Sequence, residues 1–76
     1  MESDRVVVGI KQSLKAIENG EAKKVYIAKD ADASLTEKVE VLCEKKSISV
    51  VHIDTMSELG NMFGVSVGAS VATECI

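Results

Sequence analysis

Four residues near the start of the chain have the types and spacing that suit contact with an anion or a nucleobase. Gly9 ends a short β-branched run, and Lys11, Gln12 and Lys15 follow on the first turns of a predicted helix. The helix macrodipole disfavours a cation at this position, and two cations four residues apart repel each other slightly. An anion bound at the helix N-terminus would offset both effects, because the free backbone N–H groups also point there. The alternative is a solvated lysine face, which costs only about a few tenths of a kcal/mol.

A second candidate segment lies near the other end of the chain. A predicted helix stops there at Gly64, and a small apolar loop runs on to Ala69. Gly64 and Gly68 allow a tight turn or a close approach of the backbone, but the glycines form no phosphate-binding pattern. The alternative is a half-buried strand, because apolar residues alternate with small or polar residues from 65 to 72.

The remaining residues that could support chemistry give weaker signals. Asp30 and Asp32 follow a predicted strand and could bind a divalent ion, but a plain loop leading into a helix is the simpler interpretation. His52, the only histidine, falls in a predicted strand without an identifiable partner. Cys43 and Cys75 lie far apart and outside any metal-spaced cluster, so we expect structural thiols in a reducing cytosol. We predict no metal site, no cofactor and no enzyme, since no nucleophile, base and orienting group can be assembled.

Composition indicates one small folded domain spanning residues 1–76. The chain is 46% hydrophobic and 28% charged and has no proline, and its single Tyr and single Phe leave the core to aliphatic side chains. Stacking of aromatic side chains on single-stranded bases is therefore not the expected recognition mode.

The net charge is −3, but six basic residues fall between 5 and 29, and no Lys or Arg follows Lys46. This asymmetry predicts a basic side and an acidic side. With no signal peptide and no apolar run of membrane-spanning length, we expect a cytoplasmic protein without membrane contact.

Strand and helix patterns alternate along the chain. Short apolar runs predict four strands, at residues 6–8, 24–29, 48–53 and 70–76. The first helix is predicted over 11–19, and capping boxes at Ser34–Glu37 and Thr55–Glu58 predict the starts of two more. The predicted buried positions of these last two helices are Leu35, Val39, Leu42 and Cys43, and then Leu59, Met62 and Phe63. The alternating order favours helices packed on a mostly buried sheet.

The two glycine-containing segments together resemble kink-turn-binding ribosomal proteins. That family has a Gly-x-Asn-Glu-x-x-Lys signature, which meets tandem sheared G·A pairs in the RNA major groove. Gly9, Lys11, Gln12 and Lys15 fall on its Gly, Asn, Glu and Lys positions. Both replacements, Lys11 and Gln12, look like those of the bacterial ribosomal-protein-like branch. The similarity runs from Val6 to the end of the chain, and only the family's opening helix has no counterpart.

The resemblance implies a fold and a set of RNA-binding residues. The fold would be an α/β class, three-layer α/β/α sandwich with a four-stranded mixed sheet. Lys29 would meet the RNA backbone, residues matching Asp32 and Thr36 border a flipped-out nucleotide, and the loop from Gly64 to Ala69 covers the kinked strand. The implied RNA-contacting residues of that loop are Val65, Ser66 and Val67.

The resemblance implies an RNA-binding protein that stabilises a bent, structured RNA with a kink-turn. The RNA would be ribosomal or an mRNA leader, the protein a monomer, and the setting ribosome-associated or regulatory. One alternative is a ribosome-associated protein-interaction module with weak or lost RNA binding, which the net acidity of the chain favours. Another is a small-ligand or metal site at Asp30 and Asp32.

Overall fold

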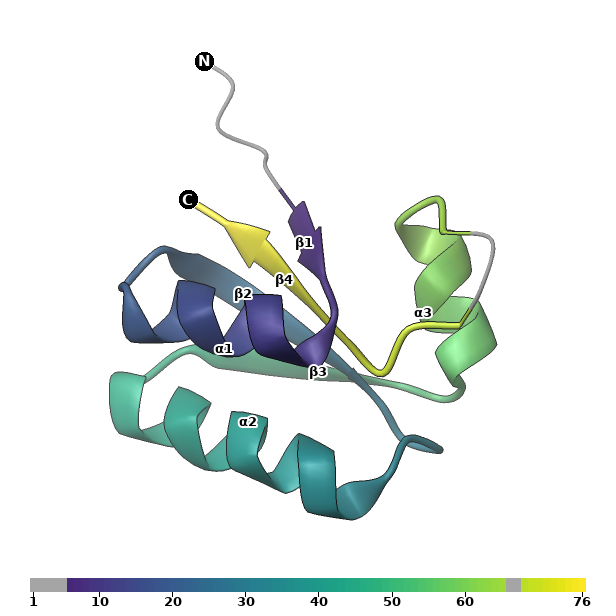
Figure 1. Cartoon of the computed structure of the whole chain (residues 1–76), viewed down its shortest axis with the longest axis horizontal. Coiled ribbons are helices and arrows are strands. Elements are labelled where there is room, and N and C mark those ends of the chain that lie inside the picture. Colours follow the sequence, from purple (N-terminus) through teal and green to yellow (C-terminus); the bar gives the residue numbers. More distant parts are fainter. Residues whose placement is uncertain (1–5, 66–67) are drawn as a thin grey trace.

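Four strands and three helices alternate along the chain, as the sequence predicts. The computed structural model describes residues 6–65 and 68–76, and Figure 1 shows the arrangement of the elements. They are β1 (Val6–Val8), α1 (Ile10–Glu18), β2 (Ala22–Ala28), α2 (Ala33–Lys46), β3 (Ser49–Ile53), α3 (Met56–Met62) and β4 (Val71–Cys75). The predicted boundaries differ from these by one or two residues at most ends.

The strands form one mixed sheet in the order β1-β4-β2-β3. The two inner strands, β4 and β2, are antiparallel, and β4 is also antiparallel to β1, whereas β2 and β3 are parallel. Helices α1 and α2 lie together on one face of the sheet and α3 lies on the other (Figure 1). The predicted three-layer α/β/α fold with a four-stranded mixed sheet is therefore confirmed.

Alternation along the strands builds a separate apolar core on each face. Val25 and Ile27 of β2 pack with Ile17 of α1 and Val39 of α2, while the next residue, Ala28, packs with Leu59 of α3. Both cysteines are buried and free. Burial, with a smaller effect of the nearby Glu40 carboxylate, raises the pKa of the Cys43 thiol to about 11. These are properties of structural thiols, as predicted.

The predicted start of α2 is corrected by the structure. Asp32, rather than Ser34, is the N-cap, and its Oδ1 accepts hydrogen bonds from Ser34 N at 3.0 Å and Ser34 Oγ at 2.8 Å. These bonds, with that from the hydroxyl contributing most, hold the pKa of the Asp32 carboxyl below its usual value. The cap of α3 is confirmed, because Thr55 Oγ1 accepts from Glu58 N at 3.0 Å.

Two predicted core residues lie at the surface. Leu35 is 42% exposed and Met62 is 50% exposed. The buried row of α2 is Thr36, Val39 and Cys43, so Leu35 lies one residue out of phase with it. Met62 ends a helix of only seven residues, which buries Leu59 and Gly60 instead. In the described part of the chain, no helix is long and apolar enough to cross a membrane.

We predict that Leu59 holds α3 against the sheet. Leu59→Ala should lower the free energy of unfolding by about 2–5 kcal/mol, because the side chain is fully buried. Met62→Ala, on the same helix, should change it by less than about 0.5 kcal/mol. Urea denaturation of both variants measures the difference, and similar losses at the two positions would contradict this account of α3.

Candidate RNA interface

Within residues 6–65 and 68–76, the N-terminus of α1 has free backbone donors and no side-chain cap. Gly9 occupies the N-cap position with φ +116°, a conformation that side-chain-bearing residues rarely adopt, and it makes no capping side-chain hydrogen bond. Its own N–H donates to the Val71 carbonyl of β4 at 2.8 Å, which fixes where the helix begins. The first intrahelical bond is from Ser13 N to Gly9 O, so the three preceding N–H groups find no acceptor among the described residues. This helix terminus is therefore ready to accept an anion or a hydrogen-bond acceptor from outside the protein.

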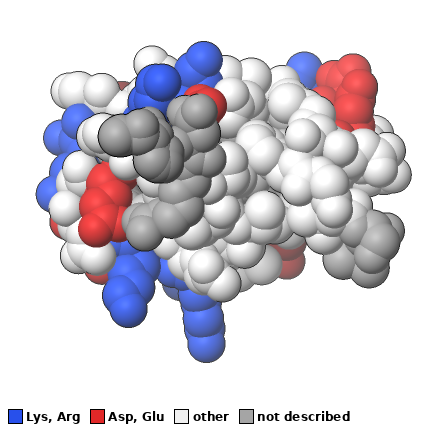
Figure 2. All heavy atoms as spheres, turned by 90° about the horizontal axis from the view of Figure 1, so that it is seen from above, with Lys and Arg blue, Asp and Glu red and all other residues white. Residues whose placement is uncertain are grey.

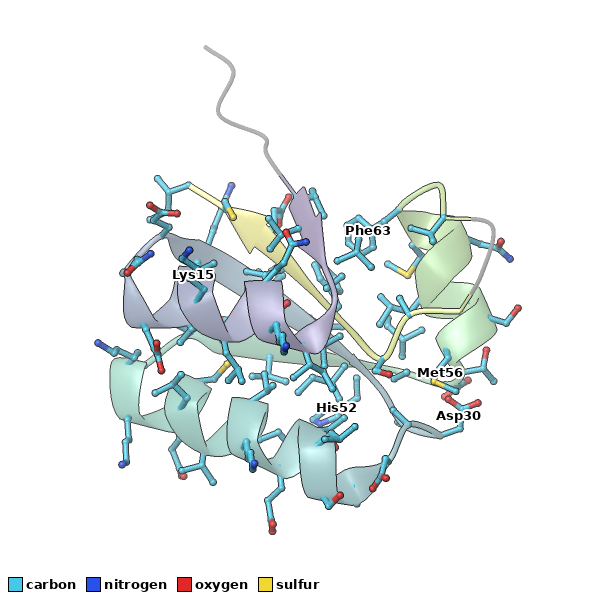
Figure 3. The ribbon with its side chains drawn as sticks, viewed as in Figure 1. Lys15, Asp30, His52, Met56 and Phe63 are labelled. Atoms are coloured by element: carbon cyan, nitrogen blue, oxygen red, sulfur yellow. The ribbon has the colours of Figure 1, made fainter. Side chains whose placement is uncertain are left out.

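The three polar residues of the predicted signature are exposed on this helix. Lys11, Gln12 and Lys15 are all exposed, and the described residues offer neither lysine an ion-pair partner. Gln12 and Lys15 line one groove of about 410 Å³ with Val7 of β1, so they project to the side of α1 that borders β1. Figure 3 shows Lys15 on the side of α1 away from α2. Gln12 and the two lysines thus present two cations and an amide beside the free N–H groups.

The connection from β2 to α2 lies at the same end of the sheet. Asp30 Oδ1 accepts a hydrogen bond from Met56 N at 2.8 Å, which ties this connection to the start of α3 (Figure 3). Lys29 Nζ lies 3.5 Å from Asp54 Oδ1 in an exposed ion pair. Lys29 is therefore the one predicted phosphate contact whose charge is already partly balanced by a neighbour.

The two remaining residues that the resemblance implied, Asp32 and Thr36, already have partners within the protein. The Asp32 carboxylate caps α2, as described above. Thr36 is only 7% exposed, and its hydroxyl donates to the Ala33 carbonyl at 3.4 Å. Their role at a flipped-out nucleotide stays a prediction. Both hydrogen bonds from Ser34 to Asp32 end on Oδ1, so its carboxylate can still accept another donor, whereas the buried Thr36 hydroxyl already uses its one donor.

The loop from α3 to β4 is folded back against Met56. Ala69 N donates to the Met56 carbonyl at 3.0 Å, and a Cβ on Gly68 would lie 3.1 Å from Met56 Cβ. The alternative of a strand from 65 to 72 is wrong, because β4 begins only at Val71 and Val65 lies in no strand. Ser66 and Val67 lie outside the described residues.

The folded chain brings these segments to one end of the sheet. Gly9 bonds to β4, Ala28 N at the end of β2 donates to the Ser70 carbonyl at 2.9 Å, and Ala69 bonds to α3. Figure 1 shows the start of α1, the β2–α2 connection and the loop before β4 at this end. Seen from above, the side toward α3 is mostly uncharged, and charged residues lie around its rim (Figure 2). A charged helix start thus adjoins a largely uncharged loop region.

Sequence reasoning missed the bond between Asp30 and Met56. It singled out Asp30 and Asp32 as possible metal ligands, but each carboxylate accepts a backbone N–H instead. Across residues 6–65 and 68–76, no three His, Cys, Asp or Glu side chains come together as a metal site would require. The pairing of Asp30 with a residue 26 positions away carries no local sequence signal.

Comparison with known proteins gives consistent matches. The model of the ribosomal protein L7Ae/L30e/S12e/Gadd45 family matches residues 1–75. A protein of Caldanaerobacter subterraneus subsp. tengcongensis, named as an RNA-binding protein, is 51% identical over 70 residues, which are 92% of this chain and 85% of that protein. The RNA-binding protein YbxF of Geobacillus stearothermophilus is 34% identical with the same coverage of both chains.

A solved structure has the same fold. The Giardia lamblia 15.5kD RNA binding protein superposes with a TM-score of 0.88 and 32% identity over 93% of this chain. The chain spans 60% of the length of that protein.

We predict that Gly64 and Gly68 tolerate a side chain to different degrees. Gly64 has φ +73° and open space around its Cα, so Gly64→Asn should cost less than about 1 kcal/mol, because Asn tolerates this conformation. Gly68→Asn should cost about 1–3 kcal/mol, because its Cβ would press on Met56, which Asp30 and Ala69 hold in place. Thermal unfolding of the two variants tests this. A larger loss at Gly64 than at Gly68 would contradict the close contact with Met56.

Proposed function

Because the chain belongs to the ribosomal protein L7Ae/L30e/S12e/Gadd45 family, we propose that it binds a kink-turn in structured RNA and stabilises the bent form. RNA binding as such agrees with this family and with relatives that are named RNA-binding proteins. The proposal concerns which RNA feature is read and by which residues. The observation that carries it is the uncapped start of α1, where free N–H groups lie beside Lys11 and Gln12.

Gln12 is proposed to read the sheared G·A pairs. Its amide oxygen can accept from a guanine N–H, and its amide nitrogen can donate to a base acceptor, without the charge of the glutamate that the family signature has here. Lys11 adds a donor for a guanine edge or a phosphate. Lys15, one turn further along α1, is suited to the RNA backbone. The positive end of the helix dipole and the free N–H groups of α1 would stabilise a phosphate bound beside any of these three residues.

The loop before β4 is proposed to pack on the kinked strand. Val65 is only half buried in the free protein, and the short-range contacts of Gly68 and Ala69 with Met56 fix the end of this loop. Val65, Ser66 and Val67 would then cover unstacked nucleotides with apolar surface, so that the bent RNA gains contacts which the straight duplex lacks.

The function proposed is architectural and non-enzymatic. One monomer would hold one kink in a ribosomal RNA or an mRNA leader, in the cytoplasm. The alternative is a ribosome-associated protein-interaction module with weak RNA binding. Two RNAs that differ only in their G·A pairs separate these functions, because a protein-interaction module would not distinguish them.

We predict a shallow salt dependence for RNA binding. If Lys11, Lys15 and Lys29 meet phosphates, log K against log salt should have a slope of roughly −2 to −3, from about 0.9 per contact. Because Lys29 already pairs with Asp54, we expect the slope to lie nearer to about −2 than to about −3. Titrations at several salt concentrations measure the slope. A slope steeper than about −6 would require a broad basic surface and would refute this footprint.

We also predict that Gln12 distinguishes a kink-turn from an ordinary duplex. Gln12→Ala should weaken binding to an intact kink-turn by about 1–3 kcal/mol, and should matter much less when Watson–Crick pairs replace the G·A pairs. Ser49→Ala is the matched control, because Ser49 is an exposed polar residue at the opposite end of the sheet. Equal losses on the two RNAs would show that Gln12 does not read these pairs.

A further inference from the structure

The outer edge of β3 has unpaired backbone groups. Among residues 6–65 and 68–76, β3 is the last strand of the sheet and pairs only with β2. The Ile53 carbonyl accepts from Lys29 N at 2.7 Å, so Ile53 directs its backbone groups toward β2. Since these directions alternate along a strand, Val50 and His52 direct their N–H and carbonyl groups toward the open edge. An edge of this kind is a template for another extended chain.

A groove runs beside this edge, between β3 and α2. We name it the β3 groove; it has a volume of about 450 Å³ and is lined by Val41, Ile48 and Val50 together with Glu37, Glu40, Glu44 and His52. Three of the lining residues are apolar, and one of them, Val41, is 47% exposed although it is a large aliphatic residue. The β3 groove therefore combines uncovered apolar surface with an unpaired strand edge.

One wall of the β3 groove is acidic. Glu37, Glu40 and Glu44 lie at i, i+3 and i+7 along α2 and so project from one face of that helix. His52 Nε2 lies 3.5 Å from Glu40 Oε2 across the groove, and both side chains are about half exposed. Figure 3 shows His52 beside α2. The described residues that line the groove include no Lys or Arg, although α2 also carries Lys38 and Lys45.

We propose that the β3 groove binds an extended basic segment of a partner protein, which adds to the sheet as a fifth strand beside β3. Its backbone would pair with the open groups of Val50 and His52, as in other cases of strand addition. Alternate side chains of a strand point to one face, so Lys or Arg at every second position would reach the glutamates of α2. Their aliphatic stems would cover Val41.

The charges of the β3 groove favour a basic segment over a second copy of the chain and over RNA. A second copy of the chain, paired edge to edge through β3, would bring two rows of glutamates together, and like charges facing each other oppose association. RNA would be repelled for the same reason. The groove is also separate from the proposed RNA interface, since the two share no residue. The intact protein should therefore hold RNA and a basic segment together.

The test uses the intact protein and a peptide of alternating Lys and Val. This peptide should bind and slow hydrogen exchange of the Val50 and His52 amides, while a peptide of the same composition with its lysines in one block should bind at least about tenfold more weakly. N-methylation of alternate peptide amides in one register should abolish binding, and in the other register should leave it intact. If neither methylated peptide loses affinity, or exchange slows at α1 instead, the proposal is wrong.

Variants locate the peptide and exclude other occupants. The double variant Glu40→Gln with Glu44→Gln should weaken peptide binding by about tenfold, and the control Glu18→Gln, an exposed glutamate on α1, should not. A saturating kink-turn RNA should leave peptide affinity unchanged. The proposal would be overturned if the RNA competed with the peptide or if the double variant and Glu18→Gln weakened binding equally. A dimer that forms through β3 in sedimentation experiments would overturn it as well.

Discussion

The proposed RNA interface depends on the position of one residue, Met56. Its N–H donates to the Asp30 carboxylate, its carbonyl accepts from Ala69 N, and a Cβ on residue 68 would lie only 3.1 Å from its own Cβ. These contacts join the β2–α2 connection, the start of α3 and the loop before β4, which are otherwise separate surface segments. Loops that carry function are usually the mobile parts of a domain. Here the contacts of Met56 set the relative positions of three such segments before any RNA is present, so less ordering remains for the binding step.

The start of α1 is fixed in a different way and for a different purpose. The caps of α2 and α3 satisfy backbone donors with Asp32 and Thr55, which stabilises those helices. At α1 the cap is Gly9, whose backbone bonds to β4 but whose missing side chain leaves the first N–H groups without an acceptor in the part of the chain that the structure describes. The chain thus gives up a stabilising cap at the one helix end where an external anion or base is proposed to take its place. Such a local departure from good helix capping is typical of a functional site.

The sequence predicted the order of strands and helices well because those signals are local, whereas the three layers and the mixed sheet were implied by the family resemblance. Apolar runs and turn residues gave all seven elements in order, and the Thr55–Glu58 pattern gave the cap of α3. Errors came where two local signals competed or where a contact is long-range. Asp32 is the N-cap in place of Ser34, because its carboxylate accepts hydrogen bonds from both the backbone N–H and the hydroxyl of Ser34. The bond from Met56 to Asp30 and the closeness of Gly68 depend on the folded chain, and no periodicity in the sequence shows them.

Segregation of charge reconciles a net charge of −3 with RNA binding. Lys11 and Lys15 stand on α1 without acidic partners among the described residues, whereas Glu37, Glu40 and Glu44 line the far side of α2. At physiological salt the screening length is about 8 Å, so exposed charges on separate helices influence each other weakly. The RNA would then meet mainly the local charge of α1, and the acidic wall is free to serve another purpose. Because an acidic wall repels both RNA and a second copy of the chain, it also disfavours contact of either one with the open edge of β3.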